Sequence, residues 1–75
     1  MKEHDLVVLT RDIPEHGLQR GDVGVVVYCY AGGEAYEVEF VAADGRTVAV
    51  LTLGKGEVRP MGQGEILHAR ALVGV

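Results

Sequence analysis

Residues 35–53 read AYEVEFVAADGRTVAVLTL, and their first half alternates between apolar and acidic side chains. The apolar members are Tyr36, Val38 and Phe40, and the acidic members between them are Glu37 and Glu39. An extended chain places successive side chains on opposite faces of a sheet, so this period of two predicts an amphipathic strand over residues 35–42. Residues 46–53 are again rich in β-branched residues and predict the strand that returns beside the first.

Glycine-containing turns separate the strands that we expect in this region. Asp44 and Gly45 lie between the two strands in the order that favours a type I′ turn. Gly32 and Gly33 mark an earlier hairpin turn, because glycine adopts positive φ angles freely. Residues 54–56, Gly-Lys-Gly, mark a third turn.

Three more strands complete the expected fold. The other β-rich runs are residues 5–10, 23–30 and 57–59, with a long polar loop between the first two. A helix across the central region is disfavoured, because the apolar period is two and glycines interrupt it. Short strands around a small core are expected to close on themselves, since closure removes exposed sheet edges. The sequence therefore predicts an all-β fold, a small SH3-like barrel of about five strands over residues 1–60.

The step Gly21-Asp22-Val23-Gly24 has a functional and a structural interpretation. Phosphate-binding loops carry a Walker or dinucleotide-binding pattern and lead into a helix, and neither feature is found here. A turn into the next strand explains the residues better, with Gly21 at positive φ and Asp22 bonded to nearby amides. Gly24 is expected to permit a bulge or a close bend of the sheet.

Residues 61–75 form a C-terminal extension with two competing interpretations. In a helix, Ile66, Ala69 and Val73 would share one face. In a strand, one face would carry Leu67, Ala69, Ala71, Val73 and Val75, and the other face would carry His68 and Arg70. The more regular period of two favours the extended form. In both cases we expect these apolar residues to pack on the barrel or on a partner chain.

Length, charge and cysteine content restrict the class of protein. The chain has 75 residues, a net charge of −4 and 48% hydrophobic residues, which predicts one small globular domain. It has no apolar stretch of about 20 residues and no signal-peptide pattern, so we expect a cytoplasmic protein without a membrane partner. The single cysteine, Cys29, excludes an internal disulfide. The absence of Asn and the presence of only two Gln fit a thermophile, and a GC-rich genome would produce the same bias.

Several of these motifs occur together in one known family. The runs HGLQRGDVGVVV (residues 16–27), GGEAYEVEFVAADGRTVAVLTL (32–53) and VRP (58–60) resemble a small bacterial family, the domain of unknown function 4926, over residues 5–60. The resemblance implies a compact SH3-like β-barrel with no assigned activity. Some members resemble small proteins encoded beside a larger partner, which implies a partner protein or an antitoxin-like role. Residues 21–27 also resemble the KOW-type element of ribosomal and transcription proteins.

A KOW-like barrel introduces nucleic acid as an alternative partner, and the charge balance argues against it. Phosphate binding needs a basic surface, whereas this chain has 11 acidic and 7 basic residues. Tyr28 and Tyr36 could stack on bases, but packing in the core or in a hairpin explains them equally well. We therefore do not expect nucleic acid as a partner.

Candidate catalytic and metal-binding residues form no recognisable pattern. The histidines, His4, His16 and His68, lack the ligand spacing of a strand or helix site. Cys29 is predicted to be a buried apolar residue on the strand face of Val23, Val25 and Val27. Glu37 and Glu39 share a strand face, which the solvent side of an amphipathic strand explains better than an acid–base pair. The chain has no Ser. We predict no enzyme activity, no metal and no cofactor.

The clearest functional signal is an excess of apolar side chains. Residues 25–28 and 48–51 are apolar on both strand faces, and a small barrel buries only one of them. We predict a non-enzymatic module that acts through protein–protein contacts, with a second copy of itself as the first choice of partner and a co-encoded protein as the other. The candidate interface residues are Val26, Tyr28, Tyr30, Leu67, Ala69, Ala71 and Val73.

Overall fold

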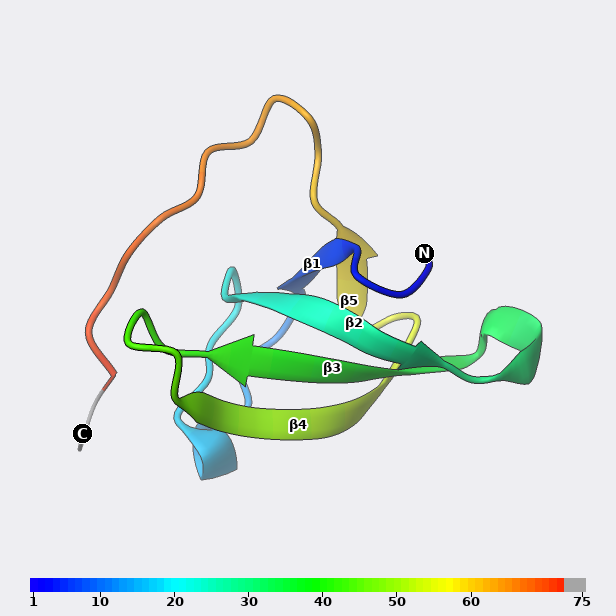
Figure 1. Ribbon diagram of the computed structural model, residues 1–75, viewed down its shortest axis with the longest axis horizontal. Coiled ribbons are helices and arrows are strands. Elements are labelled where there is room, and N and C mark those ends of the chain that lie inside the picture. The colour runs from blue at the N-terminus through cyan, green and yellow to red at the C-terminus, as the bar shows by residue number, and fades with distance from the viewer. Residues whose placement is uncertain (73–75) are drawn as a thin grey trace.

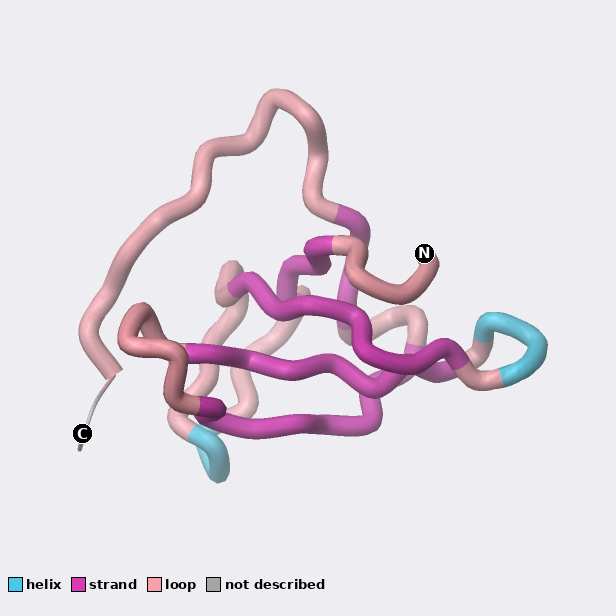
Figure 2. The backbone as a smooth tube through the Cα atoms, viewed as in Figure 1, coloured by secondary structure: helices cyan, strands magenta, loops and turns pink. Residues whose placement is uncertain are grey.

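The computed structural model describes residues 1–72, and its regular secondary structure is built from strands. The strands are β1 (Leu6–Leu9), β2 (Val23–Cys29), β3 (Ala35–Val41), β4 (Thr47–Gly54) and β5 (Val58–Pro60). Two short 3-10 turns, η1 (Pro14–His16) and η2 (Ala31–Gly33), lie in the connections. The predicted all-β class and the five strands are confirmed (Figures 1 and 2).

The strands form one antiparallel sheet in the order β4-β3-β2-β1-β5. β2, β3 and β4 run side by side, and β1 and β5 stand across one end, so the sheet is curved (Figure 1). β4 and β5 follow each other in the chain but are the two outermost strands of this order. The short β5 pairs with β1, and no ladder joins it to β4 within residues 1–72. The predicted closure into an SH3-like barrel is therefore not found in the strand pairing.

The hydrophobic core fills the inner face of this curved sheet. Its buried members are Val7, Leu9, Ile13, Leu18, Val26, Tyr36, Val38, Phe40, Leu53 and Val58. Ile13 and Leu18 come from the long loop between β1 and β2, where an isolated bridge between them turns the loop back onto the core. A loop with a polar composition thus supplies two core side chains.

Val26 is one of these core residues, so its prediction as an interface residue is wrong. Its side chain is fully buried, and it lies opposite Val38 in the register of β2 and β3. Gly24, two residues earlier on the same side of β2, is also buried. The inner face of β2 therefore begins with Gly24 and Val26, and not with the neighbouring valines.

A β-bulge in β2 corrects the predicted environment of Cys29. Val26 and Tyr28 lie opposite successive residues of β3, which leaves Val27 as an extra residue in β2. The extra residue shifts the alternation of side chains by one position. Cys29 therefore packs against the core on the side of Val26, and the face it was predicted to share, that of Val23, Val25 and Val27, is the other one.

The predicted turn glycines have the expected backbone conformation. Positive φ angles occur at Gly21, Gly32, Gly33 and Gly45. Asp44 does not share this conformation, so the predicted type I′ turn is wrong. Instead the Gly45 amide donates a hydrogen bond to the Ala42 carbonyl, and the Ala42 amide donates to the Arg46 carbonyl. This is the pattern of a three-residue hairpin loop, in which only the last residue has to be left-handed.

Residues 61–72, which we call the strap, follow β5 and contain no helix or strand. The helical interpretation is therefore wrong for the described part of the extension, and no strand forms there either. Leu67, Ala69 and Ala71, the predicted apolar strand face, are exposed, whereas Arg70 and Leu72 are partly buried. The strap arches away from the sheet and returns near the hairpin between β3 and β4 (Figures 1 and 2). Val73, a predicted interface residue, lies outside the described residues.

Candidate functional site

The end of the strap is fixed to the start of β2 by a bidentate ion pair. Arg70 Nε donates a hydrogen bond to Asp22 Oδ1 at 2.8 Å, and Arg70 Nη2 donates to Asp22 Oδ2. The same Nη2 also donates to the Gly17 carbonyl at 3.0 Å. The two charged side chains are only 21% and 17% exposed. Bidentate geometry and limited exposure make this the best-formed ion pair of the described residues.

Asp22 therefore has two structural roles: it stabilises the turn before β2, and it holds Arg70 of the strap. The sequence predicts only the first of these roles. Its carboxylate accepts a hydrogen bond from the Gln19 amide at 2.8 Å, as expected for the turn. Burial raises the pKa of Asp22, but the hydrogen bonds from Arg70 and Gln19 and the charge of Arg70 outweigh it, so the pKa lies below the ordinary 3.8. The carboxylate is charged at neutral pH. Because the folded pKa is lowered, this contribution to stability is present above pH 3.8 and is lost as the pH falls further.

The beginning of the strap is fixed by a second ion pair. Glu65 accepts hydrogen bonds from Arg59 Nη1 at 2.8 Å and Nη2 at 2.7 Å, and from the Gly62 amide at 2.6 Å. The Arg59 hydrogen bonds, followed by that of Gly62, lower the pKa of Glu65 to about 2. Both side chains are well exposed, so the pair holds the turn locally.

The Gly62 amide should report the titration of this pair. Because the folded pKa of Glu65 is lowered, the interaction is complete above pH 4.5 and is lost as the pH falls to about 2. In a ¹H–¹⁵N NMR titration of the wild-type chain, the chemical shift of the Gly62 amide should therefore change with a midpoint at a pH of about 2. Arg59→Gln should raise that midpoint towards 4.5, whereas Arg46→Gln should leave it unchanged. An unchanged midpoint in Arg59→Gln would contradict the assignment.

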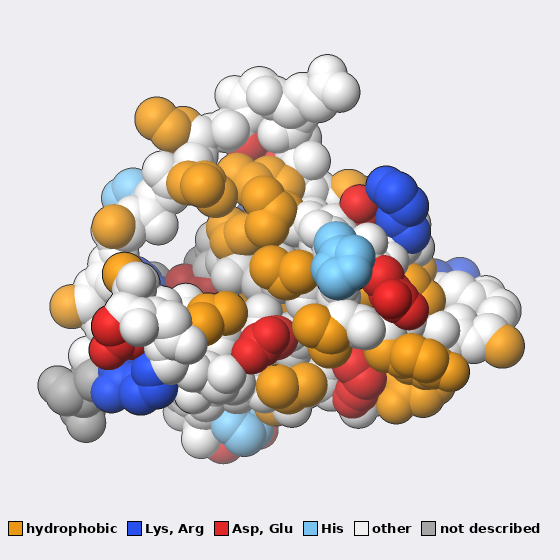
Figure 3. Space-filling model, viewed as in Figure 1, with side chains coloured by type: hydrophobic (Ala, Val, Ile, Leu, Met, Phe, Trp, Pro, Cys, Tyr) orange, Lys and Arg blue, Asp and Glu red, His pale blue; other side chains and the backbone are white. Residues whose placement is uncertain are grey.

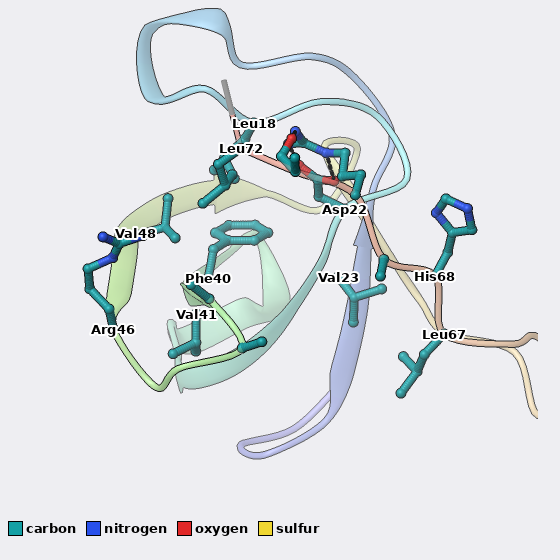
Figure 4. Close-up of a pocket in the computed structure, with 15 residues that line it drawn as sticks. Leu18, Asp22, Val23, Phe40, Val41, Arg46, Val48, Leu67, His68 and Leu72 are labelled. Carbon is teal, nitrogen blue, oxygen red and sulfur yellow. Dashed lines mark hydrogen bonds and ion pairs between the residues drawn. The ribbon is translucent and has the colours of Figure 1, made fainter. Parts of the chain in front are cut away.

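A cavity of about 690 Å³ lies between the strap and the end of the sheet (Figure 4). Its apolar lining includes Phe40 and Val48 from the sheet, Leu18 from the long loop and Leu72 from the strap. Arg46 from the β3–β4 hairpin and His68 from the strap add polar groups. The strap thus forms one wall of the cavity, and the body of the domain forms the others.

The outer face of the sheet carries a second group of apolar side chains, which we call the outer patch. Its members are Leu6, Val25, Val27, Tyr28, Tyr30 and Val50. Tyr28 and Val50 are 51% and 52% exposed, and the rings of Tyr28 and Tyr30 meet edge to face with centroids 5.0 Å apart. In Figure 3, hydrophobic side chains lie among acidic ones over β2, β3 and β4.

Glu37 and Glu39 are the acidic residues of β3 on this face. The Thr52 hydroxyl donates to Glu37 at 2.7 Å, and the Thr47 hydroxyl donates to Glu39 at 2.7 Å. The register places Glu39 between Val25 and Val50, inside the outer patch. Each carboxylate thus has its own hydroxyl partner on β4.

The histidines do not come together. Within residues 1–72, no group of three or more His, Cys, Asp or Glu side chains is arranged to hold a metal ion. The nearest polar partner of Cys29 is the Met1 carbonyl, 3.7 Å from its sulfur. In the same part of the chain, no helix has the length and apolar character needed to cross a membrane.

The remaining predicted interface residues divide between two surfaces. Tyr28 and Tyr30 belong to the outer patch, whereas the exposed Leu67, Ala69 and Ala71 belong to the strap. The Arg70–Asp22 pair could not be predicted, because 48 positions separate the two residues and no local pattern links them. Ile66, which is exposed, belongs to a predicted apolar face only in the helical interpretation of the extension.

These features define a compact all-β domain with one curved sheet, an apolar and acidic outer face and a strap across one end. The chain belongs to the family described as Domain of unknown function (DUF4926), whose model matches residues 3–60. The match includes all five strands and ends where β5 ends, so the strap follows the matched region. No curated protein and no solved structure matches the chain.

Proposed function

We propose that this domain is a non-enzymatic protein-interaction module and that the outer patch is its binding surface. The observation that carries the proposal is the exposure of several large apolar side chains on one sheet face. The exposed pair of tyrosines, Tyr28 and Tyr30, has the character of an interface anchor, because tyrosine buries a large area and keeps a polar hydroxyl.

Charge selects the kind of partner for this surface. Glu37 and Glu39 lie on the same face, so a second copy docked face to face would bring carboxylates against carboxylates. A different protein that combines apolar side chains with Lys or Arg is the better complement. The same carboxylates would repel a phosphate backbone, so the nucleic-acid alternative gains no support from this face.

The product of a gene encoded beside this one is the first partner to test, since the family resemblance implies such a pairing. Isothermal titration calorimetry with that purified protein should give saturable binding. Tyr28→Glu should weaken the binding at least about tenfold, because an aromatic anchor contributes about 2 kcal/mol or more. Charge reversal in Glu37→Lys should weaken it as well. The matched control Glu15→Lys makes the same charge change on η1, away from the outer patch, and should bind like the wild type.

A partner found by capture from a lysate of the source cells is judged by the same variants. Binding that depends on Tyr28 and Glu37 but not on Glu15 supports the proposal. Equal binding by all variants, or the absence of any partner sensitive to Tyr28, would refute it.

A further inference from the structure

We infer that the strap is exchanged between two copies of this chain, so that Arg70 of each copy pairs with Asp22 of the other in a two-fold dimer. The inference goes beyond the proposed function, because it concerns a different surface and a different partner. It rests on how the strap is anchored, on which of its side chains are exposed, and on where its binding site lies.

The strap has polar anchors at its two ends and none between them. Glu65 is held by Arg59 of the same chain, next to the end of β5, and Arg70 is held by Asp22. Among the described residues, residues 66–69 take part in no hydrogen bond or ion pair. These four residues therefore act as a hinge, which can direct the end of the strap to its own body or to a neighbour's.

The hinge carries apolar residues where a simple connector would be polar. Ile66 is 89% exposed and Leu67 is 64% exposed. Loops that serve one chain are usually polar, since water surrounds them. In an exchanged dimer the two hinges cross close to the two-fold axis, so Ile66 and Leu67 of one copy can cover those of the other. Exchange thus gives these side chains a partner that the single chain does not provide.

The groups that hold the end of the strap belong to the body of the domain. Asp22 and the Gly17 carbonyl receive the guanidinium of Arg70, and Leu72 lines the cavity beside them together with Leu18 (Figure 4). The site binds the side chains of Arg70 and Leu72, and it can bind those of either copy equally well. Exchange therefore keeps every contact of the anchor and adds the hinge contact.

Charge reversal in two separate chains tests this arrangement directly. Asp22→Arg and Arg70→Asp each leave like charges at the anchor, so each variant alone should be monomeric, near 8.0 kDa by sedimentation equilibrium. When the two variants are mixed in equal amounts, both anchors of an exchanged dimer have opposite charges again. The mixture should then show twice the monomer mass, as should the wild type and the double variant. An anchor closed within one chain cannot be restored by mixing.

A second measurement uses the wild-type chain and does not depend on how the variants fold. In a sample that mixes ¹³C-labelled and unlabelled chains, isotope-filtered NMR should show contacts between Leu72 of one copy and Leu18 of the other. Ile66→Glu, which leaves the anchor intact, should lower the dimer fraction, whereas Tyr28→Glu in the outer patch should not. A wild-type chain that stays monomeric at millimolar concentration, or a mixture of the two charge variants that stays monomeric, would overturn the inference.

Discussion

Replacing Phe40 with alanine should lower the free energy of unfolding by about 3–5 kcal/mol, which is enough to unfold most small domains. Phe40 is 2% exposed and is among the largest fully buried side chains of the core. It lies near the end of β3, opposite Ala49 of β4, and its ring lines the cavity that faces the strap. Urea denaturation followed by circular dichroism measures the effect.

Val41→Ala is the matched control, because Val41 follows Phe40 in β3 and is 46% exposed. This substitution should change the free energy of unfolding by about 0.5 kcal/mol or less. Similar losses in the two variants would mean that the core does not lie on the face of β3 that carries Phe40.

Gly24→Ala should lower the free energy of unfolding by about 1–3 kcal/mol, although it adds only one methyl group. A Cβ atom at Gly24 would lie 2.6 Å from Val38 Cγ1 and 2.8 Å from Phe40 Cε1. Both neighbours are buried core side chains, so they cannot move aside without disturbing the packing around them. Urea denaturation again gives the measurement.

Gly56→Ala provides the control for this prediction. A Cβ atom at Gly56 meets no atom within 4 Å, and the residue has no positive φ angle. The stability of the Gly56→Ala variant should therefore equal or slightly exceed that of the wild type, since alanine restricts the conformations of the unfolded chain. A neutral effect of Gly24→Ala would show that Gly24 does not lie as close to Val38 and Phe40 as the structure places it.

The strands could be predicted because their alternation and their turns are local properties of the sequence. Glu37 and Glu39 identify the outer face of β3 without ambiguity, and glycines mark the ends of the strands. β2 has no acidic residue that would identify its outer face. Its valines are equally suited to either face, so their pattern cannot show which ones are buried, and the extra residue at Val27 moves Cys29 to the opposite side. The prediction for Val26 failed for this reason.

The contacts that the sequence did not predict have no recognisable pattern in the chain. Ile13 and Leu18 look like isolated apolar residues in a polar loop until the bridge between them turns the loop onto the core. Arg70 looks like a polar residue of the extension until the strap brings it to Asp22. Neither contact has a periodic pattern, because the first is a single bridge within one loop and the second joins residues 48 positions apart.

The position of β1 has a consequence for how this chain folds during synthesis. β1 is the first strand to leave the ribosome, yet it lies between β2 and β5, the last strand. The meander of β2, β3 and β4 can form from neighbouring segments, whereas the ladder between β1 and β5 has to close almost the entire domain. One edge of β1, including the backbone of Val7 and Leu9, therefore stays without its partner until residue 60 has been made. An unpaired strand edge can template aggregation, so the chain is most vulnerable before β5 has paired with β1.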